Sequence, residues 1–369
     1  MLQTIRNFIK IFFITSILYL LFDFFFGNYF IEKFYWKKDE ANFRIEHDIY
    51  HHTKKPNFNG NAYFGGKKYK LCSDGSGFKS NCKHIGKKKK NFDIGFIGDS
   101  FTEGLGIQYE DTFVGIIQRN LKDKSVANLA VTGYSTSVYY IKIKTLLERG
   151  YNFNEIIIYI DLNDIHNEAN AFKIVNHKVE PIGKKKQTVD YLNDNEKNKD
   201  RKIKNFFRKN FKFTYENLHL IKMLIYRFNN KDIFPYVTNL DMASWPYDKN
   251  SKGYGGLGID GSIYKAKKSI IALMDLLDEK NIMYSIGVYP YPQTMFHDEV
   301  NSKHVKIWKE LCLNRCKNFF NNFPNFFEES SKIGPVETYY KYYIYRDTHF
   351  NENGHEMIAK NFLDNYDNQ

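Results

Sequence analysis

The sequence predicts an α/β protein with a parallel sheet and helices on both of its faces. From residue 91 onward, short apolar runs that are typical of buried strands alternate with segments of helical spacing. The run 155–161 (EIIIYID) is almost continuously apolar, as in a central parallel strand. With 369 residues, 43% hydrophobic and 26% charged, the chain can bury a large core. This composition excludes collagen, a wholly disordered chain and a small disulfide scaffold.

Each element follows from its local pattern. The apolar runs predict strands over 92–97, 125–129, 155–161 and 282–288. The helical spacing predicts helices over 111–121, 137–149, 262–280, 297–321 and 354–363. Shorter alternating pieces around 62–71 predict a small β element ahead of the main domain.

Three regions are expected along the chain: an N-terminal signal anchor over 1–31, a small polar β-rich segment over 32–90, and the main domain over 91–369. Residues 171–255 are rich in Lys and Asn and interrupt the alternation of strands and helices, so they are expected to be an insertion with a helix near 201–229. The insertion is expected to be either a lid over the functional site or a surface segment that takes no part in the site.

The N-terminal region contains a 21-residue apolar stretch, 11–31, in which Asp23 is the sole charge. As a helix it is about 31 Å long, enough to cross a hydrocarbon core of about 30 Å. Arg6 and Lys10 precede it and no A-x-A cleavage site follows, which predicts an uncleaved transmembrane anchor. The main domain is then expected outside the cytoplasm, in the periplasm or at the cell surface. An amphipathic or buried helix is the alternative, and the basic residues just beyond the stretch do not favour a cytoplasmic N-terminus.

The net charge of +12 comes mainly from lysine, because only 9 of the 54 basic residues are Arg. Arg is the usual reader of bases and clamp of phosphates, so we expect a solvated Lys-rich surface and no nucleic-acid partner. Attraction to anionic lipid or to an acidic polymer is the functional alternative.

The four cysteines suit an oxidising compartment. Cys72 and Cys82 flank a glycine-rich turn, which makes a local disulfide plausible. Cys312 and Cys316 are four residues apart within the helix expected over 297–321, which is poor geometry for a disulfide. Histidines and cysteines of the segment 32–90 are alternative candidates for zinc ligands, but their spacing matches no common zinc pattern. These candidates are His51, His52, Cys72, Cys82 and His84.

Four short segments carry candidate site residues: three follow predicted strands, and the fourth precedes the last predicted helix. Ser100 comes directly after the first strand in the turn that contains Gly98 and Asp99. A serine at the carboxyl edge of a sheet, near a helix N-terminus, has the surroundings that a nucleophile needs. Gly133 follows the second strand, where it can offer an unhindered backbone N–H to an oxyanion.

The other two segments complete the set. Asn163 follows the third strand, between Asp161 and Asp164, and its side-chain amide is a neutral donor. Asp347 and His349 precede the last helix, and a histidine oriented by a carboxylate is what serine activation requires. Taken singly, each signal has an ordinary structural explanation as a helix cap, a turn residue or surface polarity.

Taken in this order, the four segments resemble the SGNH (GDSL-like) hydrolase superfamily over residues 91–363, apart from the insertion. The resemblance implies a flavodoxin-like three-layer α/β/α sandwich. It implies Ser100 as nucleophile, His349 as general base and then acid, and Asp347 as its orienting carboxylate. The implied oxyanion donors are the N–H groups of Ser100 and Gly133 and the side chain of Asn163. No cofactor and no metal is implied.

Two departures from the family pattern are visible. Asp161 stands where the third block usually has Gly, which is expected to narrow the pocket or add a charge near it. The spacing Asp347-x-His349 replaces the commoner Asp-x-x-His. With Tyr50-His51-His52 ahead of the core, it resembles membrane-anchored members that act on bacterial surface polysaccharides, including proteins similar to those of alginate acetylation.

The resemblance implies a serine esterase acting on acyl groups, O-acetyl above all, of a cell-surface carbohydrate or another small ester. The same triad serves a polysaccharide O-acetyltransferase, which could have partners in envelope polysaccharide assembly. A non-catalytic carbohydrate-binding envelope protein is the alternative from another class. A tyrosine cluster offers stacking faces for sugar rings or else forms a packed strand or loop; its members are Tyr339, Tyr340, Tyr342, Tyr343 and Tyr345.

Overall fold

The computed structural model describes residues 2–27, 29, 43–182, 206, 210–215, 217, 218, 221 and 240–366. The chain divides into two units. One is formed by Met1–Lys38 and Asp190–Ile233, and the other by Asp39–Val189 and Phe234–Gln369. Most of the insertion expected over 171–255 lies outside the described residues, and so does most of the helix expected near 201–229.

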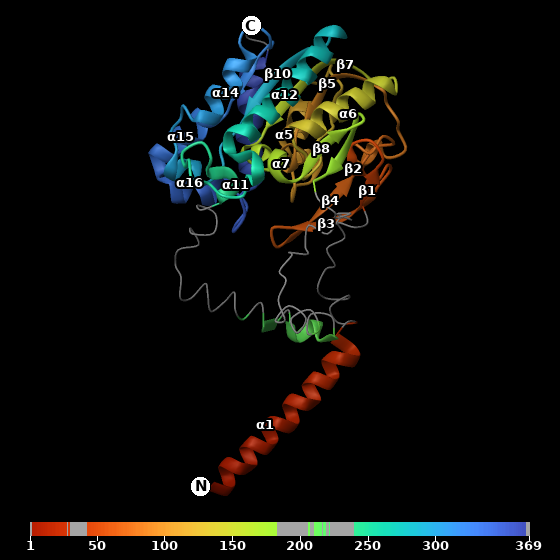
Figure 1. Ribbon diagram of the computed structural model, residues 1–369. Helices are drawn as coiled ribbons and strands as arrows, with labels where there is room; N and C mark the ends of the chain where they lie inside the picture. Colours follow the sequence, from red (N-terminus) through yellow and green to blue (C-terminus); the bar gives the residue numbers. More distant parts are fainter. Residues whose placement is uncertain are drawn as a thin grey trace. The chain divides into compact units, whose positions relative to one another are not determined.

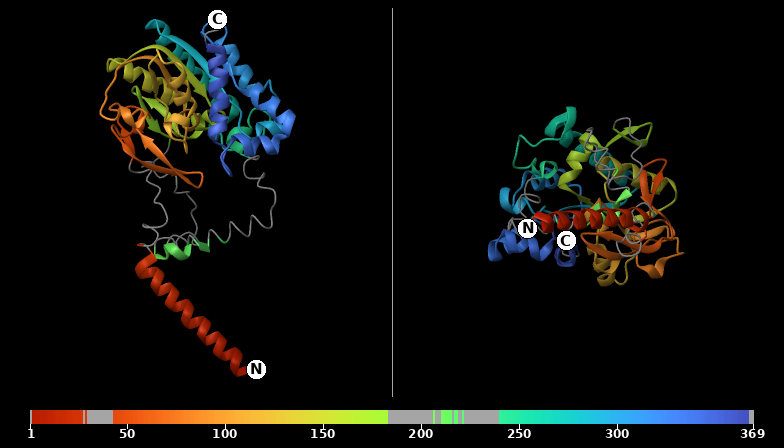
Figure 2. Two further views of the ribbon diagram at one scale, coloured as in Figure 1. Left: turned by 180° about the vertical axis from the view of Figure 1, so that it is seen from behind. Right: turned by 90° about the horizontal axis from the view of Figure 1, so that it is seen from below.

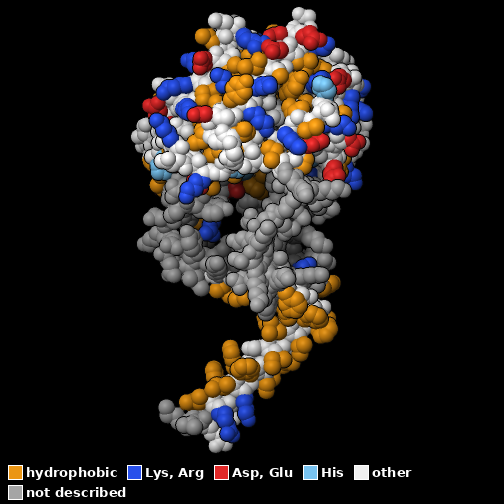
Figure 3. Space-filling view, viewed as in Figure 1, with side chains coloured by type: hydrophobic (Ala, Val, Ile, Leu, Met, Phe, Trp, Pro, Cys, Tyr) orange, Lys and Arg blue, Asp and Glu red, His pale blue; other side chains and the backbone are white. Residues whose placement is uncertain are grey.

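The first unit contains the long N-terminal helix α1 (Leu2–Phe22), followed by the π-helical turn η1 (Asp23–Gly27). Hydrophobic side chains are exposed along α1, and basic side chains lie near its N-terminal end (Figure 3). The stretch Gln3–Gly27 is long and apolar enough to cross a membrane, and it begins earlier than the stretch 11–31 predicted from the sequence. A signal sequence meets the same criteria of length and composition.

Asp23 lies within this apolar stretch but is almost fully buried. Its carboxylate accepts hydrogen bonds from the backbone N–H groups of Phe213 (3.0 Å) and Thr214 (2.7 Å). Residues 212–215, 217 and 218 are helical, so Asp23 caps a short helical segment of the same unit. The charge in the apolar stretch is therefore hydrogen-bonded within its own unit.

The second unit is built on a parallel five-stranded sheet in the order β11-β10-β7-β5-β6 (Figure 1). Its strands are β5 (Asn91–Ile97), β6 (Val126–Asn128), β7 (Asn152–Ile160), β10 (Met283–Val288) and β11 (Phe319–Asn321). Numbered along the chain within the sheet, this is the order 2-1-3-4-5 of flavodoxin-like folds. The predicted α/β class and its parallel sheet are confirmed.

Five main helices cover the sheet: α5 (Phe113–Asn120), α6 (Thr136–Glu148), α12 (Gly258–Glu279), α14 (Lys303–Cys312) and α17 (Glu352–Tyr366). The chain passes from β5 out to the edge strand β6 and then back over β5 to β7. Right-handed crossovers therefore place α5 and α6 on opposite faces. In agreement, α5 packs on α17 and α6 packs on α12. Helix α12 is in front in Figure 1, and α17 is in front when the molecule is turned by 180° (Figure 2, left).

The remaining described elements are three hairpins, six further helices and three 3₁₀ turns. The hairpins are β1–β2 (Arg44–His47, His51–Lys54), β3–β4 (Asn59–Phe64, Lys67–Cys72) and β8–β9 (Phe172–Val175, Lys178–Pro181). The further helices are α4 (Ser100–Glu103), α7 (Leu162–Asn170), α11 (Asp241–Ser244), α13 (Thr294–His297), α15 (Phe323–Ile333) and α16 (Pro335–Tyr342). Among the described residues, the 3₁₀ turns are η2 (Cys82–His84), η3 (Tyr109–Asp111) and η4 (Gly255–Leu257).

The prediction of one helix over 297–321 is wrong. Helix α14 ends at Cys312, and residues 319–321 form β11, the edge strand of the sheet. A three-residue strand has no alternation to read, and its two phenylalanines fit the helical spacing of the preceding segment equally well.

Both cysteine pairs are disulfide-bonded, with Cα–Cα distances of 5.1 Å for Cys72–Cys82 and 5.0 Å for Cys312–Cys316. The prediction of poor disulfide geometry for Cys312 and Cys316 assumed that both residues lie in one helix, and this assumption is wrong. Cys316 follows the turn that ends α14, so the chain folds back toward Cys312. Because both sulfurs of the first pair are bonded to each other, they are not available as the thiolate ligands of the alternative zinc site.

Candidate active site

The candidate nucleophile lies on a tight turn at the carboxyl end of β5. Asp99 caps the one-turn helix α4, accepting a hydrogen bond from Phe101 N at 3.0 Å, and Ser100 is the first helical residue. A Cβ on Gly98 would lie 2.2 Å from Thr102 Oγ1, so only glycine lets strand and helix approach this closely. The result is a buried serine at the edge of the sheet and at a helix N-terminus.

The three predicted triad residues form one hydrogen-bonded chain. His349 Nε2 lies 2.7 Å from Ser100 Oγ, and His349 Nδ1 lies 2.5 Å from Asp347 Oδ1. The serine hydroxyl also lies 3.2 Å from Asp99 Oδ2. The imidazole thus connects a carboxylate to a serine hydroxyl, the arrangement in which a histidine can remove the serine proton.

The carboxylate and the imidazole shift each other's pKa. Burial alone lowers the pKa of His349, but the Asp347 carboxylate outweighs it, and the pKa is raised above its ordinary value. For Asp347 burial acts in the raising direction, and the neighbouring His349 outweighs it, so the pKa of the carboxyl is lowered. Asp347 is therefore ionised at neutral pH and stabilises a protonated imidazole.

A tight turn fixes the Asp347–His349 segment. Ile344 N donates to His349 O at 2.8 Å, and Asp347 N donates to Ile344 O at 2.9 Å. On either side, Tyr343 and Phe350 form a β-bridge. The side chain of Asp347 also accepts from His349 N at 2.9 Å, which fixes the relative position of the two residues.

The predicted oxyanion donors lie on three neighbouring turns. Ser100 N is at the start of α4, Gly133 follows β6 with φ of 81°, and Asn163 is in the first turn of α7. Within the described part of the chain, the N–H groups of Ser100 and Gly133 and the side-chain NH₂ of Asn163 have no hydrogen-bond acceptor. They are free to donate to a ligand.

The predicted near-site carboxylates lie beneath the site. Asp161 is fully buried, caps α7 by accepting from Asn163 N at 3.1 Å, and accepts from Tyr291 OH at 3.1 Å. Asp164 accepts from Asp161 N at 2.9 Å and from Tyr139 OH. Asp161 thus orients the turn that carries Asn163. Burial, and then the nearby Asp99, raise the pKa of both Asp161 and Asp164 well above the ordinary value.

Two aromatic rings that sequence reasoning missed contact the imidazole of His349. Phe101 is stacked on it with ring centroids 4.5 Å apart, and Phe64 of the β3–β4 hairpin meets it edge-on at 5.2 Å. No signal in the sequence pointed to Phe64, although a small β element was expected around 62–71. Both rings cover part of the imidazole of His349.

The tyrosine cluster divides into two groups. Tyr339, Tyr342 and Tyr343 are buried, as in the packed alternative. Tyr340 and Tyr345 are each 40% exposed and are stacked on each other with centroids 6.2 Å apart. Only this pair keeps an aromatic face accessible near the Asp347–His349 turn.

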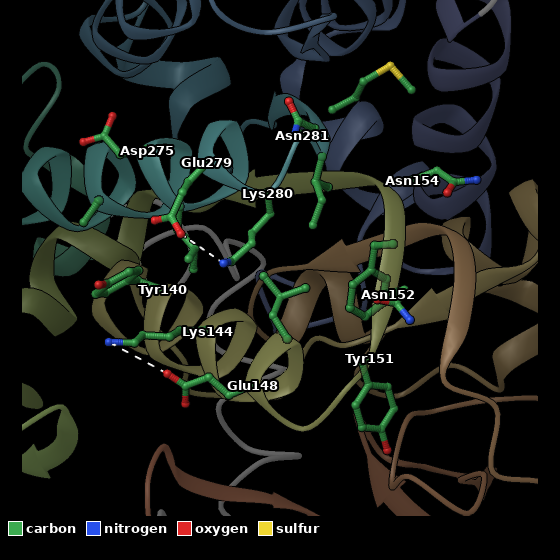
Figure 4. Close-up of a pocket in the computed structure, with 16 residues that line it drawn as sticks. Tyr140, Lys144, Glu148, Tyr151, Asn152, Asn154, Asp275, Glu279, Lys280 and Asn281 are labelled. Atoms are coloured by element: carbon green, nitrogen blue, oxygen red, sulfur yellow. Dashed lines mark hydrogen bonds and ion pairs between the residues drawn. The ribbon is translucent and has the colours of Figure 1, made fainter.

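A large hollow of about 1200 Å³ lies at the opposite edge of the sheet, where β7 and β10 begin (Figure 4). The ion pairs Lys144–Glu148 and Lys280–Glu279 lie along its walls. None of the predicted site residues lines it. Among the described residues, no group of three or more His, Cys, Asp or Glu side chains is placed to hold a metal ion.

Fold and site together define a parallel α/β protein with a Ser–His–Asp constellation at the carboxyl edge of its sheet. No protein-family model matches the chain, and no curated protein matches it. Among solved structures it is similar to a lipolytic G-D-S-L protein from Veillonella parvula (12% identity, 75% of this chain and 99% of that chain, TM-score 0.42). A catalytic mutant of an acetylxylan esterase from Geobacillus stearothermophilus is also similar (10% identity, 74% and 93%, TM-score 0.40). So is a psychrotrophic esterase from Pseudoalteromonas sp. (10% identity, 75% and 97%, TM-score 0.35).

Proposed function

We propose that the protein is a serine esterase of the SGNH type that removes ester-linked acyl groups, O-acetyl in particular, from a cell-surface carbohydrate. The observation that carries this proposal is the chain of contacts from Asp347 through His349 to Ser100, beside three donors without an acceptor. Ser100 acts as nucleophile, His349 as base and Asp347 as its orienting carboxylate.

The chemistry follows from this geometry. His349 Nε2 takes the proton of Ser100 Oγ while Oγ attacks the ester carbonyl carbon. The tetrahedral intermediate collapses, its C–O bond to the alcohol breaks, and His349 returns the proton to the departing alkoxide. Water, deprotonated by His349, then attacks the acyl-serine, and the acid leaves as Ser100 regains its proton. Asp347 stays ionised throughout and stabilises the imidazolium.

The free N–H groups of Ser100 and Gly133 and the side chain of Asn163 stabilise the oxyanion. These donors are uncharged and held by turns, so little reorganisation is needed as the negative charge develops. Loss of one such donor typically costs about 10²–10³ in rate. The buried Asp161 acts only through the turn that carries Asn163.

The proposed substrate and location rest on other features. The stacked, half-exposed pair Tyr340 and Tyr345 supports a carbohydrate substrate, because sugar rings pack on aromatic faces. The apolar helix α1 supports attachment to a membrane. The two disulfide bonds support the proposed place of the second unit outside the cytoplasm, since disulfides persist in oxidising compartments. Extraction of cell membranes with alkaline carbonate tests the attachment: an integral anchor keeps the full chain in the pellet.

Hydrolysis of p-nitrophenyl acetate by the full-length chain in detergent tests the activity. The wild type should turn over and be labelled at Ser100 by a fluorophosphonate, and Ser100→Ala and His349→Ala should do neither. The exposed residues Ser331 and His84 provide matched controls as Ser331→Ala and His84→Ala, which should behave as the wild type. Absence of both turnover and labelling in the wild type contradicts the proposal.

Hydrolysis and acyl transfer share this triad, so the acceptor must be varied. Release of free acetate from an acetylated polysaccharide, unchanged by added sugar, supports the esterase. Transfer of acetyl to an added oligosaccharide in preference to water would instead assign the same site to an O-acetyltransferase.

A further inference from the structure

Buried side chains hold the turn that follows β6, which we call the β6 loop (residues 129–134). Three of its carbonyl oxygens accept from distant side chains: Leu129 O from Lys142 Nζ (2.6 Å), Ala130 O from Lys54 Nζ (2.5 Å) and Thr132 O from His52 Nε2 (2.9 Å). A fourth carbonyl oxygen, Val131 O, accepts from Tyr134 N within the loop. Four of the six backbone carbonyls of the loop are therefore fixed by hydrogen bonds, three of them to side chains that a simple surface turn does not need.

Glu103 fixes the same loop from the side of the nucleophile. Its carboxylate accepts from Thr132 N at 2.5 Å and from Thr132 Oγ1 at 2.9 Å. Glu103 is the last residue of α4, the helix that Ser100 begins. One side chain thus links the turn that carries Ser100 to the residue that precedes Gly133.

Lys54 and Glu103 are also a buried ion pair. The two charged groups are 3.7 Å apart, and at most 1% of either side chain is exposed. Burial alone raises the pKa of Glu103, but Lys54 and then Arg44 outweigh it and lower the pKa to about 2. A buried ion pair contributes little net stability compared with apolar residues of the same size, so stability alone does not account for these charges.

Among the described residues, two backbone N–H groups of the loop have no acceptor, those of Val131 and Gly133. Gly133 N has no acceptor among the described residues, although Thr132 before it and Tyr134 after it are both hydrogen-bonded. Because φ of Gly133 is positive and its neighbours are fixed, the direction of this N–H is fixed as well. This is the property that an oxyanion donor requires.

We propose that Lys54, His52 and Glu103 are positioning residues that align the Gly133 N–H for the oxyanion, so that the β1–β2 hairpin belongs to the catalytic unit. His52 and Lys54 are two positions apart on β2 and point to the same face, from which they reach alternate carbonyls of the β6 loop. The inference rests on the proposed esterase function. Neither His52 nor Lys54 contacts the triad. Both act on Gly133 through the β6 loop.

The kinetic test uses the full chain and compares Lys54→Met and Glu103→Ala with wild type on p-nitrophenyl acetate. Both changes should lower kcat by about 10–100-fold and leave KM within about twofold, because a displaced donor weakens the transition state more than substrate binding. Glu103→Gln keeps an oxygen acceptor for Thr132 N and should recover most of kcat. The control is Lys55→Met, the exposed neighbouring lysine, which should change nothing.

Two readouts separate positioning from damage to the fold. The pH at which activity is half-maximal, set by His349, should stay in place in Lys54→Met. It should move to lower pH equally in Glu103→Ala and Glu103→Gln, because the Glu103 charge contributes to the raised pKa of His349 and both changes remove it. Hydrogen–deuterium exchange of a peptide covering 129–134 should be slow in wild type and in Glu103→Gln, and faster in Lys54→Met and Glu103→Ala. If Lys54→Met does not fold, His52→Leu and His52→Gln carry the same comparison, since the Gln amide can still donate to Thr132 O.

The exchange experiment needs no turnover, so it stands even if the proposed function fails. Unchanged exchange in Lys54→Met and Glu103→Ala overturns the inference, whatever the activity. Faster exchange with kcat within twofold of an active wild type also overturns it. An inactive wild type with the expected exchange pattern contradicts the proposed function and leaves the loop anchored as inferred.

Discussion

His349 Nε2 lies 2.7 Å from Ser100 Oγ although the two residues are 249 positions apart in the chain. The serine comes from the turn after β5, and the histidine from the segment before α17. Since α17 packs on α5 and so lies on the sheet face near the serine, the packing of these helices sets the distance between nucleophile and base.

Activity should fall as the pH drops through a value above about 6.5, the ordinary pKa of histidine. His349 must be neutral to accept the serine proton, and its pKa is raised in this site, so the inactive protonated form persists to a higher pH. The pH profile of kcat/KM measured on p-nitrophenyl acetate checks this. A midpoint below the ordinary value would contradict the pairing with Asp347.

Asp347→Asn should move that midpoint to lower pH and reduce kcat by about 10³–10⁴-fold. The amide carries no charge to stabilise the imidazolium and no longer holds the correct tautomer. Circular dichroism should show the fold intact. The exposed Asp260 is the matched control, and Asp260→Asn should leave both the midpoint and kcat unchanged.

Asn163→Ala should lower kcat by about 10²–10³-fold with little change in KM, because its amide is assigned to the oxyanion. Asn167 lies one turn further along α7 and donates to Asn163 Oδ1 at 3.4 Å. Asn167→Ala should cost much less. Equal losses in the two variants would show that the helix, and not the donor, had been disturbed.

Gly98→Ala should lower the free energy of unfolding by about 1–3 kcal/mol, as overpacking of a tight site does. The new Cβ would lie 2.2 Å from Thr102 Oγ1 and 2.7 Å from Thr102 Cβ. A Cβ on Gly256 would meet nothing within 4 Å, so Gly256→Ala should leave stability unchanged. Urea denaturation of both variants measures the difference.

Removal of the Cys72–Cys82 bond by a double Cys→Ala change should cost about 2–3 kcal/mol, and removal of Cys312–Cys316 about 2 kcal/mol, from the shorter loop that it closes. The bonded residues are 10 and 4 positions apart. Chemical denaturation with and without reductant checks both values. A wild type that reductant does not destabilise would contradict the prediction.

The sequence predicted the sheet well because its central strands are long apolar runs. Ile156, Ile157 and Ile158 of β7 are fully buried, which is what a continuous run implies. The edge strand β11 was missed because three residues carry no periodicity. The hairpin β1–β2 was also missed: its residues are polar, and its inward charges are balanced only by partners distant in the chain, such as Glu103.

The residues of the candidate site could be predicted from the sequence, but most of the contacts that hold them in place could not. The order of Ser100, Gly133, Asn163 and the Asp347–His349 pair follows from where strands end, so their meeting at one edge could be expected. Their catalytic roles stay predictions. The caps of Asp99 and Asp161 are local contacts. The contacts of Phe64 and Phe101 with His349 and the anchors of the β6 loop depend on packing between distant segments, which local patterns do not encode.

The disposition of the β6 loop has a consequence for synthesis of the chain. Lys54, Glu103 and Thr132 lie close in sequence to the serine, while the histidine is made more than two hundred residues later. The oxyanion donors proposed above can therefore be made while the chain is still growing, but the histidine proposed as the base for Ser100 is absent at that stage. Under the proposed function, Ser100 becomes reactive only when the segment with His349 and α17 has folded onto the sheet, so the growing chain has no esterase activity.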